Sequence, residues 1–146
     1  MNHANKKLSK RKALTLVLVV AAVLVAAILL RGCGQGPDVS TTEGRQDFLR
    51  ELGWEIDAAT EDIRTVQLPQ TLEGTMAEYN AMQEKQGYDL KQHLGEQCQQ
   101  VTYLVTNYPD DSQTVLVTLY IQGNRVIAGD IHSTALNGFL HGLKME

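Results

Sequence analysis

The segment VLVTLYIQGNRVIAGDIHS, Val115–Ser133, decides the fold of this 146-residue chain. Apolar residues alternate on both sides of the dipeptide Gly123-Asn124. A two-residue loop with glycine in first place is typical of a type II′ turn between antiparallel strands. We therefore predict a β-hairpin, with its first strand over residues 113–122.

A two-residue turn also fixes which residues lie opposite each other. In this register Asp130 would face Val117, and an unpaired carboxylate is costly to bury among valines. We expect either a bulge at Gly129, or pairing of Asp130 with His132 or with the backbone of the tail LNGFLHGL at the sheet's end. The expected pairs are Ile121–Val126, Leu119–Ala128, Val117–Asp130 and Val115–His132 on one face, and Tyr120–Ile127 and Leu116–Ile131 on the other.

Two helices are predicted upstream of the hairpin. Ser40 and Glu43 form a capping-box pattern before apolar residues at helical spacing, which indicates a helix over residues 42–52. The second helix is predicted over residues 72–86, with Thr71 as its N-cap. Each helix is followed by a glycine that can end it.

Residues between and after these helices complete the expected domain. Gly87 should end the second helix in a left-handed conformation, and Asp89 should cap the short turn that follows. Extended chain is predicted over residues 62–69 and a strand over residues 98–108. We expect the only tryptophan, Trp54, to anchor the core. The sequence thus predicts an α+β domain with two main helices packed on an antiparallel sheet that ends in a β-hairpin.

The N-terminal part of the chain has the composition of a membrane segment. Residues 13–30, ALTLVLVVAAVLVAAILL, contain no charge, glycine or proline and would form a helix of about 27 Å. Five Lys and Arg residues precede it, so the basic tail, residues 1–12, is expected in the cytoplasm. We predict a single-pass signal anchor in the cell membrane, a stalk over residues 31–41 and an extracytoplasmic domain over residues 42–146.

A cleaved N-terminus is the alternative. The run LLRGC, residues 29–33, resembles a lipoprotein processing box, in which Cys33 would be lipidated. Arg31 departs from that pattern, and the apolar run is longer than in a typical cleavable signal. An uncleaved signal anchor is therefore favoured.

Charge is divided sharply along the chain. From residue 31 onward there are eight Lys and Arg against seventeen Asp and Glu, a formal charge of −9. An acidic outer domain argues against nucleic acid as a partner. The expected partners are the membrane, through residues 13–30, and an envelope protein or cell-surface ligand.

Few residues have the spacing that chemistry requires. Asp89 with His93 and Asp130 with His132 could each give a metal two ligands, fewer than metal sites usually have. Ser133 follows His132 but lies outside any GxSxG motif. Paired carboxylates such as Glu61 and Asp62 are interpreted as solvated charge. We therefore predict no catalytic residue, metal site or cofactor. The candidate binding residues are Tyr79, Asn80, Gln83, Asp89, Asp130 and His132.

Two of the single residues have a structural interpretation. Asn80 is a poor residue for a helix interior, and we expect its amide to bond a neighbouring backbone group rather than a ligand. Cys98 is expected to be a small packed residue rather than a nucleophile.

Several blocks of the sequence, in order, resemble a known family. They are FLRELGWEI, YNAMQEKQGYDL, YLVTNYP and VIAGDIHSTALNGFLHGL, together with the leading apolar segment. The chain resembles clostridial-type bacterial proteins with a domain of unknown function, DUF4830, over residues 43–143. Ala128 and Tyr88 depart mildly from that family, where Gly and Phe are common. The resemblance implies membrane attachment and a small α+β outer domain, and it supplies no function or catalytic residue.

The sequence is compatible with two functions. The first is a non-enzymatic, membrane-anchored extracytoplasmic module that binds another protein or an envelope component. The alternative is a small surface enzyme, or a ligand- or metal-binding sensor, centred on Asp130 and His132. A deep pocket that joins Tyr79, Asn80, Asp130 and His132 would favour the alternative.

Overall fold

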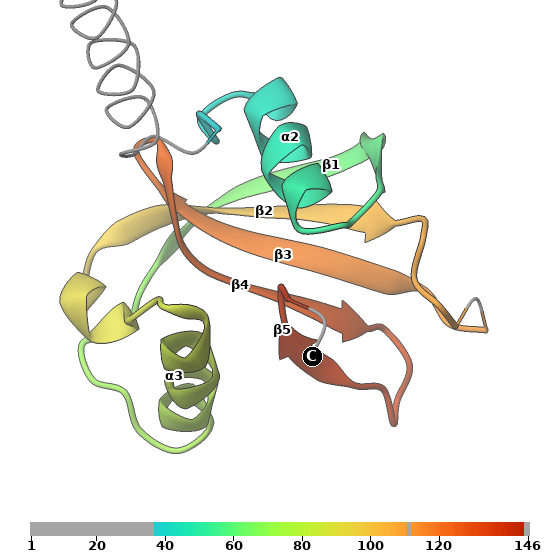
Figure 1. Cartoon of the computed structure of the whole chain (residues 1–146). Helices are drawn as coiled ribbons and strands as arrows, with labels where there is room; N and C mark the ends of the chain where they lie inside the picture. Colours follow the sequence, from blue (N-terminus) through green and yellow to red (C-terminus); the bar gives the residue numbers. More distant parts are fainter. Residues whose placement is uncertain (1–36, 111, 145–146) are drawn as a thin grey trace, which may run out of the picture. The chain divides into compact units, whose positions relative to one another are not determined.

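The computed structural model describes residues 37–110 and 112–144. Five antiparallel strands form one sheet in the order β1-β2-β3-β4-β5 (Figure 1). Two helices pack on this sheet, so the predicted α+β class is confirmed. The elements are α2 (Thr42–Glu51), β1 (Ile56–Gln67), α3 (Thr75–Gln86), the 3₁₀ helix η1 (Leu90–His93), β2 (Gln97–Val105), β3 (Val115–Gln122), β4 (Arg125–Ser133) and β5 (Leu140–Gly142).

The predicted membrane segment, residues 13–30, lies outside the described residues, as do the basic tail and Cys33. Within residues 37–110 and 112–144, no helix combines the length and apolar character needed to cross a membrane. The single-pass anchor and the lipidated alternative stay predictions.

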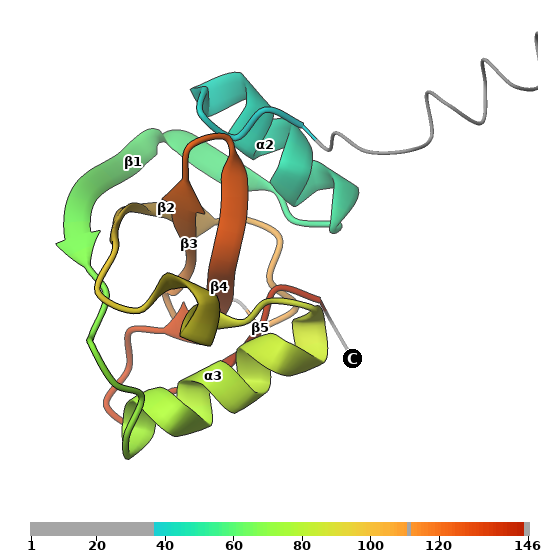
Figure 2. The same ribbon diagram turned by 90° about the vertical axis from the view of Figure 1, so that its left-hand side faces the viewer.

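The two helices cover opposite faces of the sheet (Figures 1 and 2). Alternate residues of a strand point to opposite faces, so each face has its own apolar cluster. The larger cluster lies under α2 and the smaller one under α3. The buried residues under α2 include Leu49, Trp54, Val101, Tyr103, Val117, Leu119 and Ile131. Those under α3 are Leu68, Leu90, Cys98, Ile127 and Ala128.

Helix α2 begins one residue after its N-cap, Thr41. Thr41, not the predicted Ser40, is the N-cap, and its hydroxyl accepts the N–H of Gly44 at 3.1 Å. The Ser40 N–H instead donates to the carboxylate of Asp38 at 3.1 Å, so Ser40 belongs to the preceding turn. After the helix, Trp54 is 1% exposed, which confirms its predicted place in the core.

Helix α3 starts three residues later than predicted. Its N-cap is Gly74, not Thr71, with φ 54° and ψ −129°, a conformation that residues with a side chain rarely adopt. At the other end Gly87 has φ 91°, which confirms the left-handed stop. Asp89 caps η1 by accepting the Lys91 N–H at 3.0 Å, also as predicted.

The hairpin turn is confirmed as type II′. Gly123 has φ 61°, and no described residue other than glycine has a positive φ. Asn124 therefore has a negative φ, which distinguishes type II′ from type I′.

The predicted register holds for only one pair. Ile121 faces Val126, but the next pair is Tyr120 with Ala128, so Ile127 is an extra residue in β4. This bulge, not one at Gly129, shifts the rest of β4 by one position. Asp130 consequently faces Thr118 instead of Val117, which moves its side chain to the α3 face of the sheet.

The sheet does not end at this hairpin. Residues 140–142, expected to be part of a tail, form the edge strand β5 beside β4. Strand β1 is longer than the predicted extended segment and pairs with β2 across an irregularity between Asp57 and Asp62. Among the residues that the structure describes, no further strand pairs with the outer side of β1 or of β5, so these two sides are the open edges of the sheet.

Candidate functional site

The shifted register brings three predicted residues together under α3. Asp130, 4% exposed, accepts a hydrogen bond from the Tyr79 hydroxyl at 2.7 Å through Oδ2. Its Oδ1 lies 2.8 Å from Nδ1 of His132. Burial, and then the charge of Asp130, raises the pKa of Tyr79 well above its usual value. We call these three residues the Asp130 cluster.

The Asp130 cluster holds an oriented imidazole. A carboxylate that bonds one ring nitrogen of a histidine orients the ring, as in general-base pairs, and the side chain of His132 is 29% exposed. Ser133 lies on the opposite face of β4, and its hydroxyl donates to the side chain of Gln113. Among the described residues, no three His, Cys, Asp or Glu side chains are grouped to hold a metal ion.

Asn80 and Asp89 lie at a different place. Oδ1 of Asn80 accepts the backbone N–H of Leu90 at 2.7 Å, which confirms the predicted structural bond. Its Nδ2 donates to Glu84 at 3.0 Å and to Asp89 at 3.2 Å. Both residues thus join α3 to η1, and their hydrogen-bond partners lie outside the Asp130 cluster.

Gln83 replaces part of a missing strand. Its side chain is fully buried, and its amide bonds the N–H and the C=O of Gly129, each at 3.0 Å. Gln86 extends the arrangement, because its Oε1 accepts the N–H of Leu143 at 2.6 Å. Glutamine side chains in this way satisfy backbone N–H and C=O groups where the pairing of β4 with β5 stops. Whether any of the six candidate residues contacts a ligand stays a prediction.

Replacing Tyr79 with phenylalanine tests the Asp130 cluster. The change leaves Oδ2 of a buried carboxylate without its donor, so we expect the free energy of unfolding to fall by about 1–3 kcal/mol in chemical denaturation. Tyr120→Phe is the matched control, since the half-buried Tyr120 hydroxyl accepts only a bond from Gln100. Equal losses in the two variants would contradict the importance of the buried pair.

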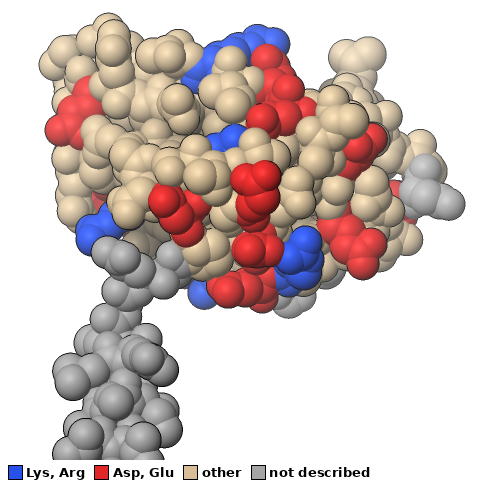
Figure 3. Space-filling view, turned by 90° about the horizontal axis from the view of Figure 1, so that it is seen from above, with Lys and Arg blue, Asp and Glu red and all other residues tan. Residues whose placement is uncertain are grey.

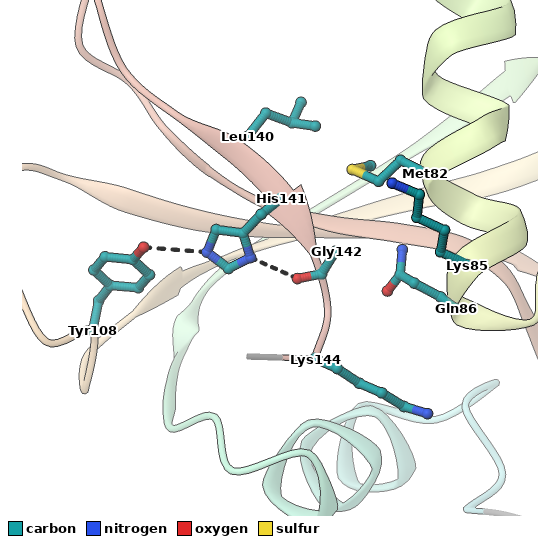
Figure 4. A pocket seen from close by; sticks show the side chains of 8 residues that line it. All are labelled: Met82, Lys85, Gln86, Tyr108, Leu140, His141, Gly142 and Lys144. Carbon is teal, nitrogen blue, oxygen red and sulfur yellow. Dashed lines mark hydrogen bonds between the residues drawn. The ribbon is translucent and has the colours of Figure 1, made fainter. Parts of the chain in front are cut away.

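Sequence reasoning missed a pocket that lies elsewhere. We name it the edge pocket; its volume is about 680 Å³. One wall of the pocket is formed by α3. The other is formed by Tyr108, which follows β2, and by Lys144, and β5 lies between the two walls (Figure 4). The lining residues are Met82, Lys85, Gln86, Tyr108, Leu140, His141, Gly142 and Lys144.

The edge pocket lies along the open side of β5. Leu140 faces His132 across the strands and so shares the α3 face. His141 faces Ile131 and shares the α2 face, where Nε2 of its ring lies 3.2 Å from the hydroxyl of Tyr108. Residues from both faces line one pocket, which places the pocket at the edge between them.

A stacked aromatic group supports the α2 side of this pocket. The ring centroids of Tyr108 and Phe139 are 4.8 Å apart and those of Phe139 and His141 are 5.4 Å apart. Nδ1 of His141 lies 2.7 Å from the carbonyl oxygen of Gly142. These contacts fix the imidazole in place and give the pocket a rigid wall.

Two positive charges stand out at the edge pocket. Acidic side chains are spread over the face shown in Figure 3, with fewer basic ones among them. Most cations on the described residues are neutralised locally, whereas both lysines of the edge pocket form no ion pair with a described carboxylate. The paired cations are Arg45, Arg50, Arg64 and Lys91, and those without such a pair are Lys85, Arg125 and Lys144.

The structure also bears on the predicted solvation of Glu61 and Asp62 and on the predicted packing of Cys98. Asp62 is half-exposed beside Arg64, in agreement with solvated charge. Glu61 is not: it accepts a bond at 2.7 Å from Arg45, which is 3% exposed. Cys98 is a buried free thiol, as predicted, and burial raises its pKa.

The chain was also compared with known proteins. A family model described as a domain of unknown function (DUF4830) matches residues 48–131. The match is shorter than the resemblance over residues 43–143 suggested, and it stops before β5. No curated protein and no solved structure matches the chain.

Proposed function

The chain belongs to the DUF4830 family, and on that premise we propose that it is a non-enzymatic binding module of the cell envelope. Residues 13–30 anchor it in the membrane, with residues 1–12 in the cytoplasm and the α+β domain outside the cell. Its partner is an envelope protein or a cell-surface ligand. The domain provides a surface for binding rather than a set of reacting groups.

The edge pocket is the observation that carries this proposal. Its size lies within the range of binding sites, and apolar and aromatic walls with a few polar groups are typical of such sites. Lys85 and Lys144 supply positive charge on a domain that has more acidic than basic residues. A ligand with a carboxylate and an apolar part would match both features.

The hydrogen bonds of the Asp130 cluster support a structural role for its carboxylate. Both oxygens of Asp130 bond to other cluster residues. No buried side-chain nitrogen or oxygen of the described residues lacks a hydrogen-bond partner.

Site-specific photocrosslinking in intact cells tests the binding role. The full-length chain carries a photoreactive amino acid at Leu140, 53% exposed in the edge pocket, or at Ile63, 45% exposed on the opposite edge strand. We expect a reproducible crosslinked product from position 140 and not from position 63. No product at 140, or the same products at both positions, would contradict a partner at the edge pocket.

Protease accessibility tests the tether. A tag at the C-terminus of the full-length chain should be removed by protease added to intact cells, and the protein should require detergent for extraction. A chain recovered in the soluble fraction, with its tag protected until lysis, would contradict membrane attachment. A cytoplasmic protein with a defined fold serves as the lysis control.

The Asp130 cluster carries the second candidate function, a surface enzyme or ligand- or metal-binding sensor. The observation in its favour is the part-exposed ring of His132, which Asp130 orients. Metal analysis of the purified full-length chain and of His132→Gln tests it. Stoichiometric metal that the substitution removes would support this candidate, and equal trace amounts in both proteins would oppose its metal-binding form.

A further inference from the structure

Backbone groups of β5 face the open edge of the sheet. The N–H of Ser133 donates to the C=O of Phe139 at 3.0 Å. In an antiparallel ladder, bonded and non-bonded pairs alternate, so Ile131 and His141 form the next bonded pair. The N–H and C=O groups of Leu140, and the N–H of Gly142, therefore point away from β4.

This edge is available to another strand. An unpaired strand edge is a template for the addition of an extended chain, which gains main-chain hydrogen bonds along its length. The carbonyl of Gly142 is engaged by the ring of His141, so the groups offered to an added strand centre on Leu140. Leu140 lines the edge pocket together with residues from both faces of the sheet.

Side chains around the edge define what an added strand should carry. Alternate side chains of a strand point to opposite faces, where they would meet Met82 and Leu140 on one side and Tyr108 on the other. Lys85, on α3, and Lys144, the residue after Leu143, flank the same space (Figure 4). Carboxylates on the added strand would pair with these lysines and would be repelled by most other parts of the acidic domain.

We propose that the edge pocket binds an extended, acidic peptide segment of a partner protein, which adds to β5 as a sixth strand. The inference rests on the proposed function and specifies its ligand. Main-chain bonds to Leu140 give affinity, and carboxylates opposite Lys85 and Lys144 give selectivity.

A second copy of the chain fits the edge pocket less well than a different protein. The other open edge, β1, does carry acidic residues. However, Glu61 is engaged by Arg45 at 2.7 Å and Asp62 by Arg64 at 2.6 Å. Two of the three carboxylates of β1 are thus neutralised within their own domain, and the third, Asp57, accepts the N–H of Ala59 at 2.9 Å, so the strand offers little charge to a neighbour's lysines.

Peptide selection against the purified full-length chain tests the proposal. A displayed library of random decapeptides is the probe, and bound peptides are sequenced. We expect enrichment of Asp and Glu interleaved with β-branched or aromatic residues, the composition of an acidic strand. Failure to enrich any sequence, or enrichment of basic or helical ones, would overturn the proposal.

Variants then locate the enriched peptide. Lys85→Glu with Lys144→Glu should weaken its binding by about tenfold or more, since two attractive charges become repulsive. Arg125→Glu makes the same kind of change away from the edge pocket, and binding should stay within about twofold of the wild type. Equal effects of the two sets of variants would overturn the site.

A proline at position 140 tests strand addition itself. Leu140→Pro removes an outward N–H but none of the ladder bonds to β4, and it should weaken binding by about fivefold relative to Leu140→Ala. Methylation of alternate peptide amides should have a similar effect. Binding that tolerates both changes would overturn addition to β5, with circular dichroism showing that each variant is folded.

Two further outcomes separate this inference from the proposed function. A crosslinked partner whose capture is unaffected by the edge-pocket variants would leave the binding module standing and overturn the peptide site. Self-association of the full-length chain that Leu140→Pro abolishes, measured by sedimentation, would identify a second copy as the occupant and overturn the partner segment.

Discussion

Replacing Trp54 with alanine should lower the free energy of unfolding by about 3–5 kcal/mol, the range for large aromatic residues in cores. The ring is 1% exposed, and its Nε1 donates to the carbonyl of Leu143 at 2.5 Å. It also stacks on Tyr108 with ring centroids 5.9 Å apart. Trp54 therefore connects the start of β1 to the chain segment that follows β5, and its replacement removes the contacts between them.

Trp54→Phe is the control for this prediction. It keeps an aromatic ring in the core and removes the indole N–H, so its loss of stability should be clearly smaller than that of Trp54→Ala. Because the chain has one tryptophan, unfolding must be followed by circular dichroism rather than by tryptophan fluorescence. A loss below about 1 kcal/mol in the alanine variant would contradict its anchoring role.

Replacing Arg45 with methionine should also destabilise the domain strongly, by about 3 kcal/mol. The buried guanidinium donates to the Tyr103 hydroxyl at 2.7 Å, to the Val39 carbonyl at 3.0 Å and to Glu61 at 2.7 Å. Methionine fills similar volume but leaves the carboxylate of Glu61 without its cation. Chemical denaturation at neutral pH measures the effect.

Matched variants separate the buried pair from an exposed one. Arg50→Met removes a solvent-exposed ion pair with Asp47, and its effect should stay within about 0.5 kcal/mol. The double variant Arg45→Met with Glu61→Leu leaves no unpaired charge and should recover part of the stability lost in Arg45→Met. No recovery would mean that the lost packing of Arg45, rather than its charge, dominates.

The same pair gives the domain a dependence on pH. Burial alone would raise the pKa of Glu61, but hydrogen bonds from Tyr103 and Arg45 outweigh burial and hold that pKa below its usual value. A carboxyl with a lowered pKa stabilises the fold above its unfolded pKa, about 4.3, and this contribution is lost as the pH falls through the folded value. The stability difference between wild type and Glu61→Gln should therefore shrink below about pH 4.

Much of the fold follows from local sequence. The alternating apolar residues around Gly123-Asn124 predict the hairpin, and Gly87 and Asp89 predict the end of α3 and the start of η1. Such signals act over a few residues, because caps and turns satisfy backbone groups of their immediate neighbours. The strong signal for a membrane segment in residues 13–30 is also local and stays a prediction.

The candidate sites were less predictable, and particular residues show why. Nothing in the spacing of β4 reveals that Ile127 is an extra residue, yet this bulge decides that Asp130 meets Tyr79 instead of Val117. Glu61 is part of an acidic stretch, and from the sequence alone it is interpreted as solvated charge. Its ion pair and its partial burial depend on Arg45, sixteen residues away and on another element.

The sequence by itself determined the alternation of polar and apolar residues, the turns and caps, and from these an α+β domain with an acidic surface. The tertiary structure alone decided that residues 140–142 become an edge strand, because the amides of Gln83 and Gln86 bond Gly129 and Leu143 where strand pairing stops. It alone also gathered the edge pocket from three separate segments of the chain, which are α3, the residues after β2, and residues 140–144. Such a site depends on long-range contacts, and these are formed by packing between elements rather than by the preferences of any one segment.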